Sequence, residues 1–200
     1  RTPADIEKIG IPTVTVDNET TLEAANLARS ILGDQLEVVT RGLNVHSTHM
    51  TRDLAKMVGL QNMMMLMYDD PAFLHAIMKR FLAGHMARLD FLEANGLLTL
   101  NNDWSYVGSG GIGYCRELPR RTMAPGSPVR AEDLWLHDES QESVGVSPDM
   151  FAEIIYPYQA PVHARFGMNC YGCCEALESR WHVVKGIPNL RRVSVSAWAD

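Results

Sequence analysis

The sequence predicts an α/β fold of the (β/α)8 barrel (TIM-barrel) type. Apolar or β-branched runs alternate with amphipathic segments of crossover-helix length, which is typical of parallel βα units. Polar residues follow several predicted strands, as in barrels whose chemistry lies at the C-terminal ends of the strands. About five strands are expected, and a barrel closes with eight. We therefore expect residues 1–200 to be a single barrel domain that holds only part of the barrel, as a fragment of a longer chain.

The N-terminal half is predicted to contain three helices and two strands. Thr20 or Thr21 is expected to cap the first helix, which ends at Gly33. The second and third are separated at Pro71, because proline disfavours the α conformation in the residue before it and suits the first turn of a helix. The helices are expected over 20–31, 51–67 and 71–95, and the strands over 36–42 and 96–101.

The C-terminal half begins with a long loop rich in glycine and proline that runs to about Val129. A Gly-x-Gly-x-x-Gly pattern at 108–113 lies inside this loop and does not open a helix, so it is weak support for a dinucleotide site in a doubly wound sheet. Strands are expected over 133–137, 167–173 and 190–198, and helices over 147–166 and 175–184.

Composition restricts the classes of partner. The formal net charge is −6, which provides no basic surface for nucleic acid. No apolar run is long enough for a membrane-spanning helix, so we expect a cytoplasmic protein. We expect its partner to be a small-molecule substrate. Strands that do not close into a barrel expose their edges, and we expect further residues or a partner chain, such as a second copy in a homo-oligomer, to cover them.

Three of the four cysteines are clustered, which favours a metal, redox or reactive-thiol site over a disulfide framework. In an extended strand, Cys170 faces away from Tyr171 and Cys173, and only a turn at Gly172 brings the thiols together. Carboxylates after the preceding strand complete a metal set on the same rim. The predicted ligands are Cys170, Cys173, Cys174 and Glu142. The structural alternative is a buried Cys170 with the other two cysteines packed under a helix.

Other polar residues after strands are candidates for catalysis or binding. Glu139 and Asp103 are predicted to orient a substrate or to act as acid and base, although an Asp in this position also commonly forms a turn. His46 is a candidate for binding substrate, and His49 competes with it. Arg116 is predicted to bind a carboxylate or phosphate, and the alternative is a solvated loop.

Three stretches resemble the uroporphyrinogen decarboxylase superfamily. The segment Gly59–His75 is similar to its helix, Asp-Pro, helix segment, and 146–158 is similar to its "Ser-Pro-Glu-x-Phe … Pro-Tyr" helix. The strand that ends in Tyr171-Gly-Cys173-Cys174 lies where the methyltransferase branch has His-x-Cys-Gly. The resemblance covers roughly Gly59 to Trp198 and implies a (β/α)8 barrel.

The methyltransferase branch implies that this chain moves a methyl group between a corrinoid, presented by a partner protein, and a small substrate. Zinc held by thiolates would activate the substrate. Tyr171 takes the place of the family's histidine ligand and is grouped with the substrate-binding residues. A cofactor-free lyase (decarboxylase) acting on a carboxylated ring is the alternative reaction, and a non-catalytic binding barrel is the alternative class.

Overall fold

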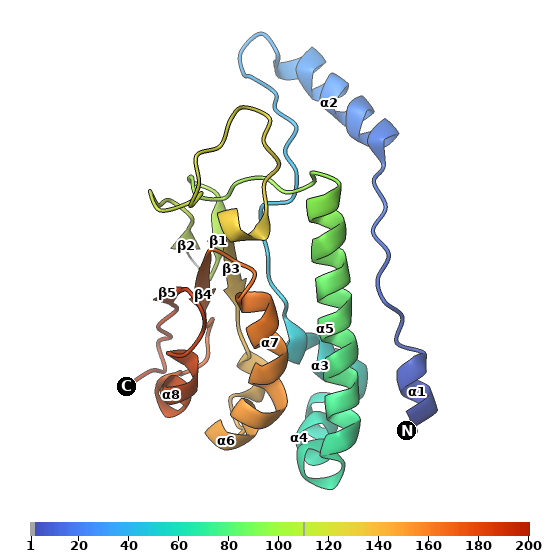
Figure 1. The fold of residues 1–200 in the computed structure, drawn as a ribbon, viewed down its shortest axis with the longest axis vertical. Helices are drawn as coiled ribbons and strands as arrows, with labels where there is room; N and C mark the ends of the chain where they lie inside the picture. The colour runs from blue at the N-terminus through green and yellow to red at the C-terminus, as the bar shows by residue number, and fades with distance from the viewer. Residues whose placement is uncertain (1–2, 110) are drawn as a thin grey trace.

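The computed structural model describes residues 3–109 and 111–200, which form a mixed α/β structure (Figure 1). The helices are α1 (Pro3–Glu7), α2 (Asn18–Leu32), α3 (Met50–Val58), α4 (Leu60–Asp69), α5 (Pro71–Ala94), η1 (Ala131–Asp133), η2 (Gln141–Ser143), α6 (Pro148–Met150), η3 (Phe151–Ile155), α7 (Tyr156–His163), η4 (Glu178–Arg180) and α8 (Trp181–Val184). The strands are β1 (Tyr106–Gly108), β2 (Gly111–Ile112), β3 (Trp135–Asp138), β4 (Met168–Tyr171) and β5 (Leu190–Val193).

The central element is a three-stranded parallel sheet in the order β3-β4-β5, which confirms the prediction of parallel βα units. The antiparallel hairpin β1-β2 packs on β3, where Gly108 lies so close to the His137 ring that any side chain at this glycine would collide with it. The predicted barrel is not seen, because the strands in the described residues form this open sheet and the hairpin.

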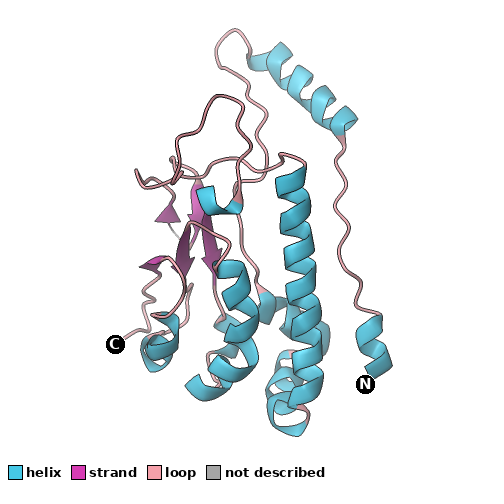
Figure 2. Ribbon diagram, in the orientation of Figure 1, coloured by secondary structure: helices cyan, strands magenta, loops and turns pink. Residues whose placement is uncertain are grey.

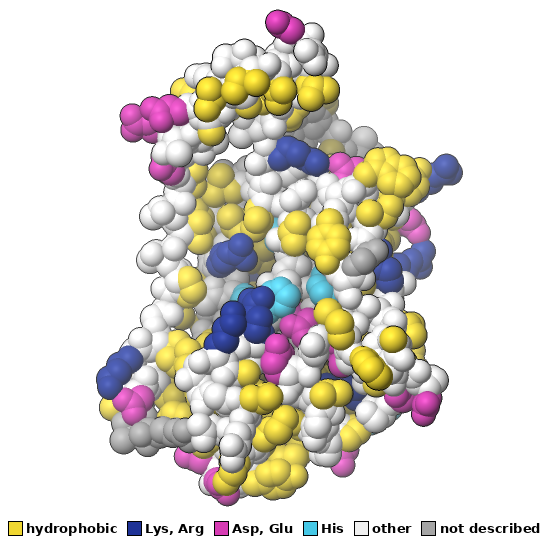
Figure 3. All heavy atoms as spheres, turned by 180° about the vertical axis from the view of Figure 1, so that it is seen from behind, with side chains coloured by type: hydrophobic (Ala, Val, Ile, Leu, Met, Phe, Trp, Pro, Cys, Tyr) yellow, Lys and Arg dark blue, Asp and Glu magenta, His cyan; other side chains and the backbone are white. Residues whose placement is uncertain are grey.

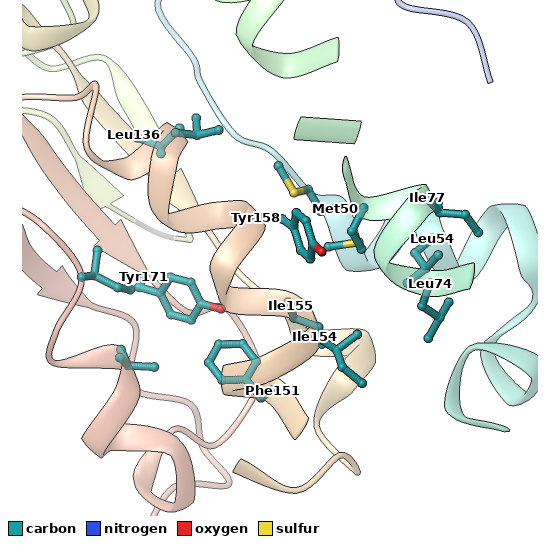
Figure 4. Close-up of a cluster of buried hydrophobic side chains, with 14 of the residues drawn as sticks. Met50, Leu54, Leu74, Ile77, Leu136, Phe151, Ile154, Ile155, Tyr158 and Tyr171 are labelled. Carbon is teal, nitrogen blue, oxygen red and sulfur yellow. The ribbon is translucent and has the colours of Figure 1, made fainter. Parts of the chain in front are cut away.

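The two faces of the sheet bury different sets of residues. Leu136 and Tyr171 point into the main core, which they share with residues of α3, α5 and α7 (Figure 4). Trp135, Met168 and Cys170 form a second, smaller cluster on the opposite face. This alternation follows from the two-residue period of a strand. The helices that make the main core lie to one side of the sheet (Figure 2).

Local sequence signals explain the helices around the core. Asp70 caps α5 by accepting a hydrogen bond from the Phe73 backbone N–H at 3.0 Å, and Pro71 occupies the first turn. The prediction of a single helix over 51–67 is wrong, because Gly59 adopts φ +86° and separates α3 from α4. No helix in the described part of the chain, α5 included, has the length and apolarity to cross a membrane.

The N-terminal arm differs most from expectation. Asp17, and not Thr20 or Thr21, caps α2 by accepting the Thr20 backbone N–H at 2.9 Å. α2 has no buried residue and stands apart from the sheet (Figure 1). The strands expected over 36–42 and 96–101 are reduced to one parallel bridge between Leu43 and Leu98, because neither run finds a partner along its length.

The C-terminal half follows the predicted order with shorter elements. Ser147 caps α6 as expected, but the helix passes through a π-helical segment, η3, before it continues as α7. The helix expected over 175–184 begins only at Glu178, and the last strand ends at Val193. The residues between β4 and η4 are therefore free to form a loop at the end of the sheet.

Candidate functional site

A cavity of about 290 Å³ lies where strands β3 and β4 end. Asp138 ends β3 and is in register with Tyr171, the last residue of β4, so residues that follow these two strands meet at one edge. The polar side chains that line the cavity are His46, Ser47, His49, Arg52, Tyr106, Ser109, His137, Glu139, Gln141, Glu142 and Cys173. Histidine, basic and acidic side chains gather in the middle of one face of the molecule (Figure 3).

Glu139 and His49 form a hydrogen-bonded couple inside this cavity. The His49 Nδ1 atom lies 3.0 Å from Oε1 of Glu139, whose side chain is only 7% exposed. The other carboxylate oxygen accepts the Gln141 backbone N–H at 2.7 Å, which fixes the orientation of the carboxylate. Because a carboxylate only accepts hydrogen bonds, Nδ1 carries the proton and Nε2 is left to exchange one with a substrate.

The backbone places the His49 ring at a conformational cost. His49 has φ 47° and ψ 35° and precedes the first residue of α3. A left-handed conformation outside glycine costs on the order of 1–3 kcal/mol and persists where surrounding contacts enforce it. Ser109, which also lines the cavity, has φ 37°. Two such residues on one cavity are typical of a functional site, where strained backbone is concentrated.

Three other residues that line the cavity, Glu142, His137 and Arg52, are held in place by hydrogen bonds to their neighbours. Glu142 accepts a hydrogen bond from the Thr51 hydroxyl at 2.8 Å, which ties the loop after β3 to the start of α3. The His137 Nε2 atom lies 2.9 Å from the Gly172 carbonyl oxygen, and this contact joins the ends of β3 and β4. Arg52 is the cation of the cavity, and its Nε donates to Asp53 at 3.3 Å.

The loop after β4 places Cys173 on the cavity and Cys174 on the surface. The Cys173 backbone N–H donates to Oε2 of Glu175 at 2.8 Å, and the two sulfur atoms lie 3.7 Å apart. Burial raises the pKa of the Cys173 thiol, and the neighbouring Cys174 acts in the same direction. Cys173 is therefore a protonated thiol near neutral pH.

These residues do not fit the predicted zinc site. Cys170 lies in the smaller cluster, outside the lining of the cavity, and its sulfur accepts a hydrogen bond from Arg192 Nε at 3.2 Å. Cys174 is exposed and does not line the cavity either, so the four predicted ligands are not gathered around one point. Within residues 3–109 and 111–200, no three His, Cys, Asp or Glu side chains are arranged to hold a metal ion.

Three other predicted site residues lie elsewhere. The Asp103 carboxylate pairs with Arg41 at 3.0 Å and accepts the Ser105 N–H, as the turn-forming alternative requires. Tyr171 is fully buried, with its hydroxyl 2.7 Å from Ser140 Oγ, so it supports the core and does not line the cavity. Arg116 is exposed and lines a different cavity, beside Trp135 and Met168.

His46 lies in the wall of the cavity but is almost fully buried. Its Nε2 atom has no hydrogen-bond partner among the described residues. Burial lowers the pKa of His46 to about 4, and the positive charge of Arg88 acts in the same direction. The ring is therefore neutral at physiological pH and contributes shape and a weak acceptor to the cavity wall.

We expect the His46 ring to titrate with a midpoint near pH 4 when its Cε1 proton is followed by NMR and assigned with a His46→Gln variant. The folded pKa lies below the unfolded value of about 6.5. The folded state therefore binds fewer protons between these values, and its stability falls as the pH drops through this window. A midpoint near 6.5, or identical acid sensitivity in His46→Gln, contradicts this interpretation.

The sequence pattern identified the edge of the sheet where the cavity lies, but it did not identify all the residues that line the cavity. Glu139, Glu142, His46 and Cys173 were predicted and do surround one cavity. His137, Arg52 and Ser109 were not predicted. Period-two alternation from Glu139 back along β3 could have indicated His137, whereas no local signal placed the hairpin residue Ser109 near the thiol.

No family model, curated protein or solved structure matches this chain. The likeness to the uroporphyrinogen decarboxylase superfamily therefore rests on the sequence motifs around Gly59–His75, 146–158 and the end of β4. The function has to be argued from the chemistry of the cavity itself.

Proposed function

We propose that this chain is an enzyme and that the Glu139–His49 couple is its general acid and base. The observation that carries the proposal is the 3.0 Å contact between the two side chains inside a cavity at the C-terminal ends of parallel strands. Such an edge is where α/β enzymes place their chemistry. We further propose that the sheet is part of a (β/α)8 barrel, as the sequence motifs imply.

The proposed reaction is methyl transfer to a small protic acceptor such as a thiol. Nε2 of His49 removes the proton from the acceptor S–H group, and the sulfur electron pair forms the new bond to the methyl carbon. The bond between that carbon and its donor breaks, and the donor leaves with the electron pair. Glu139 stabilises the imidazolium that forms, because its carboxylate holds the Nδ1 proton.

The cavity limits how a methyl donor approaches. A volume of about 290 Å³ suits a small acceptor and is too small for a corrinoid, so a corrinoid does not fit inside it. A donor held by a partner protein would have to present its methyl group at the mouth, next to Cys173 and Arg52. The side chains of this chain then bind the acceptor and move its proton.

Methyl transfer is tested with methylcobalamin as the probe donor and a panel of small thiols as acceptors. We expect the purified protein to form a thioether, detected by mass spectrometry, with a matching change in cobalamin absorbance. Protein carrying His49→Gln gives the background rate of the uncatalysed reaction. Equal rates with the wild type and His49→Gln for every thiol would reject this reaction.

A lyase acting on a carboxylated ring is the second candidate, favoured by a separate cavity of about 700 Å³ beside Trp135 and Met168. Arg116, Arg191 and Arg192 line this cavity, and the Arg192 guanidinium lies 5.0 Å from the centre of the Trp135 ring. Arginines bind carboxylates, and the largely buried Trp135 indole gives the cavity wall an aromatic surface. Carbon dioxide release from aromatic carboxylates, without thioether formation in the methyl-transfer assay, would favour this reaction.

A further inference from the structure

Cys173 and Cys174 form a pair of neighbouring thiols in the loop after β4, beside the cavity. Both are free thiols, and their sulfur atoms lie 3.7 Å apart. Cys173 lines the cavity, whereas Cys174 is exposed to solvent. One sulfur is therefore open to attack from solution and the other is within reach of the first.

The backbone holds this pair in place. Gly172 turns the chain after β4 with φ +98°. The Cys173 N–H then donates to Glu175 at 2.8 Å and the Cys174 N–H to Gln141 Oε1 at 3.3 Å. The sulfurs, in contrast, contact each other. Their distance must shorten to about 2.05 Å for a disulfide, and because the two residues are adjacent, the bond closes a strained ring through the peptide between them.

We propose that Cys173 and Cys174 are a reversible two-electron redox site that forms a disulfide between adjacent residues. The oxidant is a low-molecular-weight disulfide of the glutathione class. The Cys174 thiolate attacks one sulfur of this disulfide and releases a thiol, which leaves a mixed disulfide. Cys173 then attacks the Cys174 sulfur and releases the second thiol. Two protein S–H bonds and one S–S bond break, one protein S–S bond forms, and two small thiols carry away the protons and electrons.

The geometry makes this disulfide easy to reduce. Adjacent Cα atoms are about 3.8 Å apart across a trans peptide, less than the usual separation of about 4.4–6.8 Å in disulfides. Strain of this kind raises the reduction potential and is typical of labile, regulatory disulfides. Oxidation also draws the Cys173 sulfur towards Cys174 and changes the cavity wall, so it would alter the activity proposed above. That last consequence alone rests on the proposed function.

The other two cysteines provide an internal comparison. Cys170 is buried in the smaller cluster, where Arg192 donates to its sulfur. Cys115 lines the separate cavity beside Trp135 and Met168. Neither belongs to the pair at the end of β4, so a Cys115→Ser variant retains the proposed site.

The test exposes the full chain to mixtures of oxidised and reduced glutathione and measures its intact mass and thiol content. Wild type and Cys115→Ser are expected to lose the mass of two hydrogen atoms, with the crosslink mapped to Cys173 and Cys174. The Cys173→Ser variant keeps the exposed thiol without its resolving partner, so it should accumulate at least roughly tenfold more glutathione mixed disulfide than wild type. Circular dichroism spectra check that each variant is folded.

A second measurement uses phenylarsine oxide, which bridges two neighbouring thiols with loss of water. Wild type and Cys115→Ser should bind it in a form that resists competition by a monothiol, and both Cys173→Ser and Cys174→Ser should lose this binding. A stable mixed disulfide on wild-type Cys174, or a crosslink that involves Cys115 or Cys170, overturns the proposal. None of these readouts depends on enzymatic activity, so they can fail or succeed independently of the proposed reaction.

Discussion

Replacing Glu139 by Gln is expected to slow turnover by roughly 10²–10⁴-fold, the usual contribution of a positioned acid–base group. The carboxylate now accepts hydrogen bonds from both His49 and the Gln141 backbone. A neutral amide has only one oxygen for these two donors and cannot stabilise an imidazolium by charge. The measurement is kcat for thioether formation as a function of pH, and we expect the alkaline plateau to fall in the variant.

A matched control separates this loss from a general effect of removing a carboxylate. Glu153 is an exposed residue of η3, outside the cavity, so Glu153→Gln should turn over at the wild-type rate. Thermal unfolding of Glu139→Gln establishes that the protein remains folded. If folded Glu139→Gln retains kcat within about threefold of wild type, the couple does not act as the general acid and base.

The parts of the fold that were predictable are those with a strong local cause. Asp70 and Pro71 supply a cap and a first-turn proline, and the helix over 71–95 was predicted almost to its ends. Strands depend on partners far away in the sequence, so the β-branched run at 36–42 did not become a strand. The sheet is formed instead by 135–138 and 168–171, which pair in parallel and in register.

The candidate site shows the same division between local and long-range causes. Glu139 and Cys173 were predictable because both directly follow the carboxyl ends of parallel strands. Asp103 also follows a predicted strand, but Arg41, which lies 62 residues earlier in the chain, engages its carboxylate. Tyr171 was expected to share a side with Cys173, but it is the last residue of β4 and points into the main core.

Removing the Asp138 carboxylate is expected to cause a large loss of stability. Asp138 is fully buried at the end of β3. One oxygen accepts from the Thr48 hydroxyl at 2.6 Å and lies 3.1 Å from Nε2 of His163, and the other accepts the Glu139 N–H at 3.0 Å. Asp138→Ala leaves these three buried groups without their partner, and each unpaired buried group typically costs about 1–3 kcal/mol, so the variant should lose at least about 3 kcal/mol of its free energy of unfolding in urea at pH 7.

The pH dependence of this loss distinguishes a charged network from simple packing. Burial alone raises the pKa of Asp138, but hydrogen bonding to His163, the charge of that ring and the Thr48 hydroxyl outweigh burial and hold the pKa below its usual 3.8. The carboxylate therefore contributes its stability above the unfolded pKa and loses it as the pH falls through the lower folded value. The difference between wild type and Asp138→Ala should shrink below about pH 4. The exposed Asp149 supplies the control, and Asp149→Asn should stay within about 0.5 kcal/mol of wild type. A cost below about 1 kcal/mol, or one unchanged at pH 3, would show that packing and not charge secures Asp138.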